Sequence, residues 1–182
     1  SMINSIRFDS HVSTIKDNSF FECYSLKSVT LPSSIKKIGM NAFSGCFSLK
    51  EIVIPSSVAE IGCNTFKNCQ NLEQITIPSS ITIIKSHLFD GCHSLKHISI
   101  PPSVISIKDY AFKDCKSLTQ MIIPSSVLTI GDFAFNGCSS LKRLFISSSV
   151  KVIGHYAFKD CSSLIYAEAP ILERYGTGIF DG

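Results

Sequence analysis

Short stretches in which apolar side chains alternate with polar ones recur along the whole chain, and residues 46–68 illustrate one such unit. Residues 49–54 end in alternating positions, which is typical of a strand with one buried face. Pro55 ends this strand because it has no backbone N–H to donate, and residues 58–61 return apolar side chains to the interior. The pattern predicts a strand within 49–54, a second and weaker strand near 58–61, and one helical turn over 63–68.

This unit repeats with a fixed period of 23 residues. Cysteine occurs at positions 23, 46, 69, 92, 115, 138 and 161. Phenylalanine stands three residues before each of these cysteines and leucine three residues after, and a proline follows nine residues after each, with Ser147 as the one exception. Because three unrelated residue types share one register, the chain is predicted to be a repeat protein.

A single unit has too few large apolar side chains to offset the conformational entropy lost when its backbone is ordered. Stacked units pair their strands at a spacing of roughly 4.8 Å and close one continuous core. We therefore expect residues 1–182 to form one domain, an α/β solenoid of about seven 23-residue units. A parallel β-sheet is expected on its concave face, with short second strands and helical turns on the other sides.

The units resemble the BspA-like, or Treponema-type, class of leucine-rich repeats, whose form is L-x-x-I-x-I-P-x-S-V-x-x-I-G-x-x-A-F-x-x-C. The segments "LKEIVIPSSVAEIGCNTFKNC" and "LTQMIIPSSVLTIGDFAFNGC" match this form nearly position for position. The resemblance runs from about Ile3 to Gly182 and implies a right-handed coil. Lys85 and Lys108 replace the glycine of the form, so we expect that this turn does not require a positive φ.

Composition narrows the possible partners. A hydrophobic share of 45% predicts a folded chain, and a formal charge of +3 is too mild for a dedicated nucleic-acid or anionic-membrane binder. No apolar run reaches the roughly 20 residues that span a bilayer, so membrane insertion is not expected, and residues 1–10 carry no secretion signal. Ser1 before Met2 resembles a tag-cleavage scar. Neither end has a clear polar cap, and residues 171–180 fit the unit only after a one-residue deletion, which leaves a fragment of a longer array or self-association through the ends as alternatives.

The regularly spaced cysteines lack the close C-x-x-C pairs that a metal or redox site needs. We interpret them as small apolar side chains in the core. Cysteines stacked in one column point the same way, so free thiols and a reducing compartment are expected. Cys63 stands on a different column and is the candidate accessible thiol.

No catalytic motif is present: the sequence has no H-E-x-x-H, no G-x-S-x-G, no phosphate-binding loop and no dinucleotide fingerprint. The five histidines occupy several different repeat positions. We expect no enzyme activity, no cofactor and no metal site.

Function is expected on strand positions that the repeat leaves variable. Towards the C-terminus these become apolar and aromatic, and Ile122, Phe145, Arg143 and Tyr166 have the composition of an interface hot spot. Beside them lie His97 and Gln120. The second candidate is a column next to the predicted helical turn, which we interpret as shielding the edge of the coils. Its members are Asn41, Asn64, His87, Tyr110, Phe133 and Tyr156.

These features predict a non-enzymatic protein-interaction scaffold that binds another protein, preferably inside the cell. By analogy with other leucine-rich-repeat proteins, one alternative is a regulatory partner of an enzyme such as a Ser/Thr protein phosphatase. Because the BspA-like class is known for adhesion, the other alternative is a cell-surface adhesin that binds host or matrix proteins.

Overall fold

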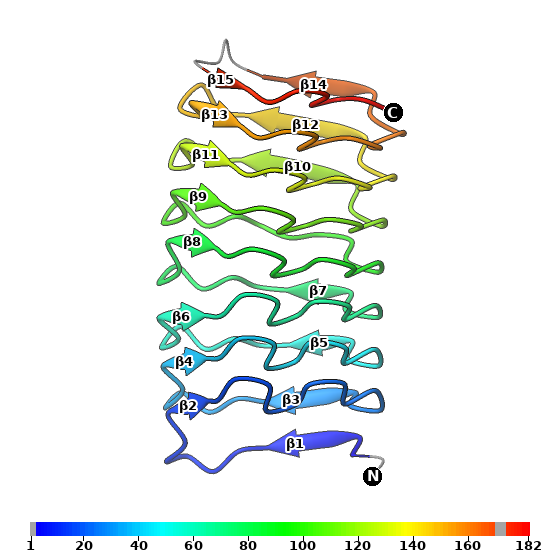
Figure 1. Cartoon of the computed structure of the whole chain (residues 1–182). Coiled ribbons are helices and arrows are strands. Elements are labelled where there is room, and N and C mark those ends of the chain that lie inside the picture. Colours follow the sequence, from blue (N-terminus) through cyan, green and yellow to red (C-terminus); the bar gives the residue numbers. More distant parts are fainter. Residues whose placement is uncertain (1–2, 170–173) are drawn as a thin grey trace.

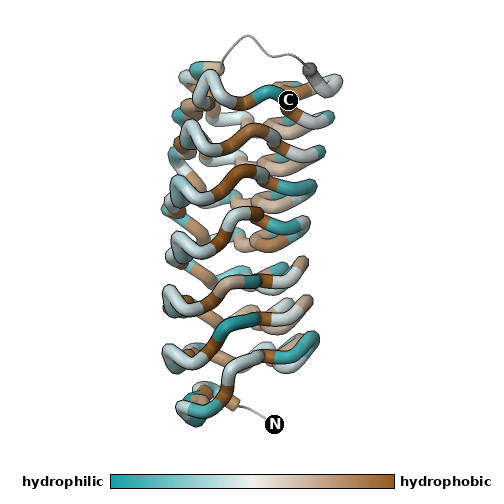
Figure 2. The backbone as a smooth tube through the Cα atoms, turned by 90° about the vertical axis from the view of Figure 1, so that its left-hand side faces the viewer, coloured by the Kyte–Doolittle hydropathy of each residue, from teal (hydrophilic) through white to brown (hydrophobic). Residues whose placement is uncertain are grey.

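The computed structural model describes residues 3–169 and 174–182. Over these residues the chain winds as a right-handed parallel β-solenoid of about seven turns, stacked in a nearly straight column (Figure 1). Figure 2 shows the column turned by 90°, with hydrophobic segments recurring at the same place in each coil. Since neither view shows a marked bend, the face expected to be concave is close to flat. Ser1 and Pro170 lie outside the described residues.

Strands occupy two sides of each coil. The first-strand face carries β1 (Ser5–Arg7), β3 (Ser28–Thr30), β5 (Glu51–Ile52), β7 (Gln74–Ile75), β10 (Gln120–Ile123), β12 (Arg143–Ile146) and β14 (Tyr166–Glu168). The second-strand face carries β2 (Thr14–Ile15), β4 (Lys37–Ile38), β6 (Glu60–Ile61), β8 (Ile83–Ile84), β9 (Ser106–Ile107), β11 (Thr129–Ile130), β13 (Val152–Ile153) and β15 (Arg174–Tyr175). Both strands predicted for residues 46–68 are therefore present, although each is only two residues long.

Neighbouring coils pair in parallel with a 23-residue step. Ile6 lies opposite Val29, and Val29 lies opposite Ile52. At the C-terminal end the step shortens, because Ile153 pairs with Tyr175, 22 residues further on. The one-residue deletion expected from the sequence is thus confirmed by the strand register.

The core consists of columns of identical side chains. Phe43 and Phe66 stack with centroids 5.8 Å apart and an interplanar angle of 1°, and similar pairs continue along the column. At the N-terminal end Phe8 packs edge-on against Phe20, with centroids 5.7 Å apart. Parallel rings at this spacing maximise buried apolar contact between coils and add an aromatic contribution of about 0.5–1.5 kcal/mol per pair.

The predicted helical turns are wrong. No described residue is helical, and residues 63–68 form a series of turns. Asn64 and Asn68 have φ of 56° and 57°, in the left-handed region, where a right-handed helix cannot continue. Their N–H groups donate instead to Ser86 and Asp90 of the next coil, at 3.1 and 2.7 Å. The segment therefore pairs with its neighbour in the stack rather than with itself.

The second left-handed position shows a longer period on this flank. Glycine alternates there with a larger polar residue, in the order Glu22, Gly45, Asn68, Gly91, Asp114, Gly137 and Asp160. A Cβ on Gly137 would lie 2.5 Å from Oδ1 of Asp114, so each glycine leaves room for the side chain of the coil before it. The packing period on this flank is two units, or 46 residues.

Glycine at the end of the second strand has a different role. Gly62 and Gly131 do not have a positive φ, as expected from their replacement by lysine in two units. A Cβ on Gly131 would lie 2.6 Å from the backbone nitrogen of Asp109, so glycine permits close approach of neighbouring coils. At Lys85, the first unit with lysine here, the sheet of the second-strand face is interrupted between β6 and β8. At Lys108, which follows another lysine, pairing is intact.

The close approach at Gly131 is testable by substitution. Gly131→Ala should lower the free energy of unfolding by about 1–3 kcal/mol, because the added methyl group overlaps the backbone of the preceding coil. Lys108→Ala occupies the same repeat position, already carries a Cβ, and should change stability by less than about 0.5 kcal/mol. Urea unfolding of both variants measures the difference. Equal stability of Gly131→Ala and the wild type would contradict this role for the glycine.

Candidate protein-interaction face

The first-strand face brings five of the six predicted contact residues together. Register places Gln120 beside Arg143 and Arg143 beside Tyr166, while Ile122 lies beside Phe145. The rings of Phe145 and Tyr166 have centroids 5.4 Å apart. These residues share a face because side chains along a strand alternate between inward and outward positions.

The members of this cluster differ in exposure. Ile122 is 55% exposed and Tyr166 is 49% exposed, whereas Phe145 is half-buried. The negative charge of Glu168, which accepts a hydrogen bond from the Tyr166 hydroxyl at 3.2 Å, raises the pKa of this phenol. The cluster therefore presents apolar and aromatic surface together with one guanidinium group, that of Arg143, which is also exposed.

The sixth residue, His97, lines a hollow further towards the N-terminus on the same face. The hollow has a volume of about 870 Å³, is open to solvent, and also includes Gln120 and Ile122. Sequence reasoning missed two other residues that line it, Glu51 and Val53, although Val53 is 77% exposed and stands in the same column as Ile122. An outward valine between polar neighbours was the available signal. The face thus has two adjoining regions, an aromatic cluster and a hollow.

The edge column behaves as its interpretation requires. His87, Tyr110, Phe133 and Tyr156 stack in sequence, with centroid separations of 4.6, 5.0 and 5.1 Å. Because each ring covers the face of the next, only ring edges remain open to a ligand. The packing supports an edge-covering role, in which stacking also offsets the cost of a left-handed backbone at each of these bulky residues.

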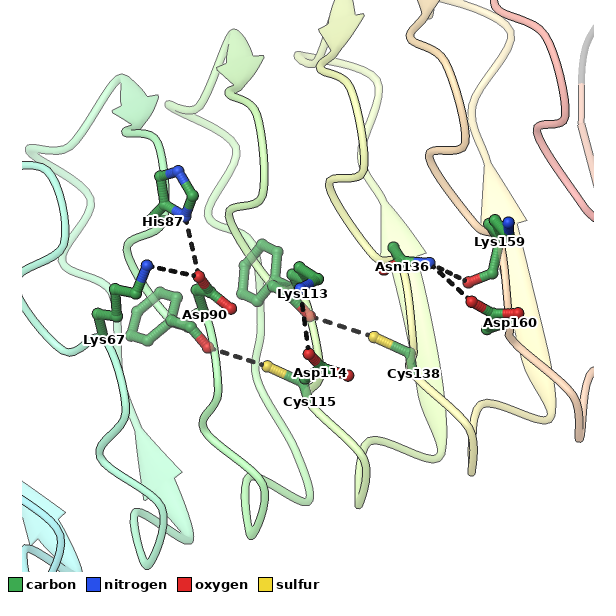
Figure 3. Close-up of polar contacts among 12 residues, drawn as sticks. Lys67, His87, Asp90, Lys113, Asp114, Cys115, Asn136, Cys138, Lys159 and Asp160 are labelled. Carbon is green, nitrogen blue, oxygen red and sulfur yellow. Dashed lines mark hydrogen bonds and ion pairs between the residues drawn. The ribbon is translucent and has the colours of Figure 1, made fainter. Parts of the chain in front are cut away.

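A polar cluster beside this column was examined for catalytic geometry (Figure 3). His87 Nδ1 lies 2.9 Å from Oδ2 of Asp90, and the same oxygen accepts an ion pair from Lys67 at 3.1 Å. The Asp90 side chain is only 11% exposed. Neither His87 nor Asp90 hydrogen-bonds to a serine, threonine or cysteine side chain in the described structure. The cluster therefore joins neighbouring coils and holds no activated nucleophile.

The eight cysteines are free thiols, as expected. Those from Cys46 to Cys161 in the repeat column are buried, and each donates its S–H to a phenylalanine carbonyl of the preceding coil (Figure 3). For example, Sγ of Cys69 lies 3.2 Å from the carbonyl oxygen of Phe43. Sequence reasoning predicted the burial of these side chains and missed this hydrogen bond.

Burial makes these thiols unreactive. Desolvation raises the pKa of the Cys46 thiol to about 12 and raises the pKa values of Cys69 and Cys115 well above the ordinary thiol value. The thiolate is the form that binds metals and attacks electrophiles, and it is nearly absent at neutral pH. Across residues 3–169 and 174–182 no group of histidine, cysteine or carboxylate side chains is arranged to hold a metal ion. The same ranges contain no helix of the length and hydropathy needed to cross a bilayer.

A parallel solenoid of 23-residue units with leucine, phenylalanine and cysteine columns is a leucine-rich-repeat architecture. The family model described as "BspA type Leucine rich repeat region" matches six copies over residues 1–119 and 82–182. The chain belongs to the BspA-type leucine-rich-repeat family. None of the curated proteins matches the sequence.

Solved structures agree with this assignment. A leucine-rich-repeat protein of Treponema pallidum is 30% identical, with a TM-score of 0.82 over 90% of this chain and 79% of its own. A leucine-rich-repeat protein of Bacteroides ovatus is 27% identical, with a TM-score of 0.69 over 97% of this chain and 69% of its own. A leucine-rich cell surface protein of Faecalibacterium prausnitzii is 27% identical, with a TM-score of 0.50 over 91% of this chain and 59% of its own.

Thiol labelling of the native protein tests the burial of the column. Cys23 and Cys63 are the two partly exposed cysteines and should react with Ellman's reagent at mildly alkaline pH. The six buried cysteines should react only after unfolding, because they are inaccessible and their pKa values are raised where a shift is resolved. Rapid labelling of Cys92 or Cys115 in the native protein would show that the column is open to solvent.

Proposed function

We propose that this chain is a non-enzymatic protein-interaction module that binds another protein through its first-strand face. The contact is centred on the aromatic cluster of Ile122, Arg143, Phe145 and Tyr166, with His97 and Gln120 at its N-terminal margin. Proteins of this repeat family generally serve as interaction scaffolds, which is consistent with such a role.

The observation that carries the proposal is the exposed cluster on a rigid support. Ile122 and Tyr166 expose about half of their surface, and strand pairing from β10 through β12 to β14 fixes their spacing. Large aromatic and arginine side chains that are already ordered lose little conformational entropy on binding, which is why they dominate interface energetics. The variable strand positions supply specificity, while the repeated positions maintain the stack.

The compartment distinguishes two forms of this function. Our preferred form is an intracellular scaffold, which suits a chain whose eight cysteines are all free. The second candidate is a cell-surface adhesin for host or matrix proteins, favoured by the resemblance to the leucine-rich cell surface protein of Faecalibacterium prausnitzii. Surface labelling of intact native cells separates the two, since only the adhesin is modified.

Site-specific crosslinking tests the proposed face. A benzophenone side chain at position 122 should capture a discrete partner from the native organism, because this position lies within the cluster and is 55% exposed. The double substitution Phe145→Asp with Arg143→Asp should reduce this capture by about tenfold or more, with a nearly unchanged melting temperature.

Ile105 provides the matched control. It is 49% exposed and lies next to β9, on the second-strand face. A benzophenone at position 105 should capture nothing comparable, and Ile105→Asp should leave capture from position 122 intact. If the double variant captures the same partner as efficiently as the wild type, the proposed face is refuted.

A further inference from the structure

The hollow on the first-strand face lies where two neighbouring coils separate. β7 continues only as a single bridge from Gln74 to His97, and the next strand, β10, pairs with β12 alone. In the other coils the equivalent contact begins with a bond such as that from Lys142 N to Thr119 O, at 2.9 Å. Within the described residues no backbone hydrogen bond joins 97–104 to 119–127. We call this opening the split.

Side chains record the same separation. The second serine of the turn after the first strand normally donates to the coil before it, as Ser103 Oγ does to the carbonyl of Ile81 at 2.7 Å. Across the split, Ser126 Oγ is buried and has no hydrogen-bond partner within the described structure. Ile98 is only partly buried, whereas Ile75 and Met121 on the coils before and after it are buried. The split therefore exposes apolar surface at the floor of the hollow.

The split is confined between intact contacts. On one side Ser117 N donates to the carbonyl of His93 at 3.0 Å, and on the other Leu128 N donates to the carbonyl of Ile105 at 2.9 Å. The coils are therefore held together at both ends of the opening. A ligand finds this hollow already formed and does not have to separate the stack.

The lining of the hollow has a definite chemistry. Outward Val53 and Ile122 stand at its two ends, and between them the same column carries the small side chains of Thr76 and Ser99. The neighbouring column provides side-chain amides, including that of Gln120. These groups form two apolar walls with small hydroxyls and amides between them.

Charge in the hollow is one-sided. Among the residues that line it, Glu51 is the one side chain with a full charge at neutral pH. Its Oε2 accepts only a long hydrogen bond from Gln74 Nε2, at 3.5 Å. A carboxylate so weakly engaged is available to pair with a cation on a ligand.

We propose that the hollow binds an extended segment of a partner protein, running along the axis of the column, with two apolar side chains four residues apart and a lysine or arginine near the first. Val53 and Ile122 are three coils apart, or about 14 Å, and four residues of extended chain span about 13–14 Å with both side chains on one face. The apolar residues pack on Val53 and Ile122, and the cation pairs with Glu51. The inference rests on the proposed function and names the chemistry of its partner.

Selection from a phage-displayed library of random 12-residue peptides against the immobilised wild-type chain tests this inference. Enriched sequences should share two apolar residues four positions apart and a basic residue near the first. For a synthetic peptide of the consensus, Val53→Asp should weaken binding by about tenfold or more in fluorescence anisotropy. Glu51→Gln should weaken binding less, by removing the ion pair, and should reduce its dependence on salt.

Two controls separate this proposal from the proposed function. Ile83→Asp, on the second-strand face, and Phe145→Asp, in the aromatic cluster outside the hollow, should both leave peptide affinity unchanged. Peptides that lose affinity in Phe145→Asp but not in Val53→Asp would overturn the inference and leave the proposed function standing. Absence of enrichment, or enrichment without the four-residue spacing, would also overturn it, while capture from position 122 tests the proposed function separately.

Discussion

The phenylalanine carbonyl in each coil joins that coil to the next one. The carbonyl oxygen of Phe43 accepts the N–H of Cys46 at 3.1 Å within its own coil and the S–H of Cys69 at 3.2 Å from the following coil. The same arrangement recurs at Phe66, Phe89 and Phe112. Because a thiol in this column must be small enough to be buried and must donate a hydrogen bond, alanine and serine each satisfy only part of the requirement. A change of one residue in the period would misalign this bond together with the stacked rings.

Registered stacking also explains why the surface is available for binding. Inward positions are occupied by phenylalanine, cysteine, leucine and isoleucine in nearly every coil, so variation is confined to outward strand positions and to the edge column. On the first-strand face these positions change from polar residues near β3 to the aromatic cluster near β12 and β14. The split interrupts this face without breaking the column, since the phenylalanine and cysteine contacts run past it. One part of the cross-section thus maintains the stack while another varies.

Much of this architecture was predictable from the sequence, because a strict period specifies which residues become neighbours. The strands, the buried thiols, the shortened last step and the shared face of Ile122, Arg143 and Phe145 all follow from it. The helical turns were predicted wrongly, because phenylalanine or tyrosine at a left-handed position gives no local sign of positive φ, although Asn64 at the equivalent position was a hint. The split was not predictable, because Ser126 is the same residue as its hydrogen-bonded equivalent Ser103. Their difference arises from spacing between coils, which residue identity does not encode.

Unfolding of two internal deletions tests the central claim most directly. Removing residues 93–138 deletes two whole units, preserves the 46-residue alternation by placing Asp160 above Gly91, and joins Cys92 to Ser139 in register. This variant should retain its β-structure by circular dichroism and unfold in a single cooperative transition. Removing residues 93–127 deletes less of the chain but shifts the columns out of register, and it should abolish the cooperative transition. If the shorter deletion unfolds as cooperatively as the longer one, registered stacking of the columns is not what holds the protein together.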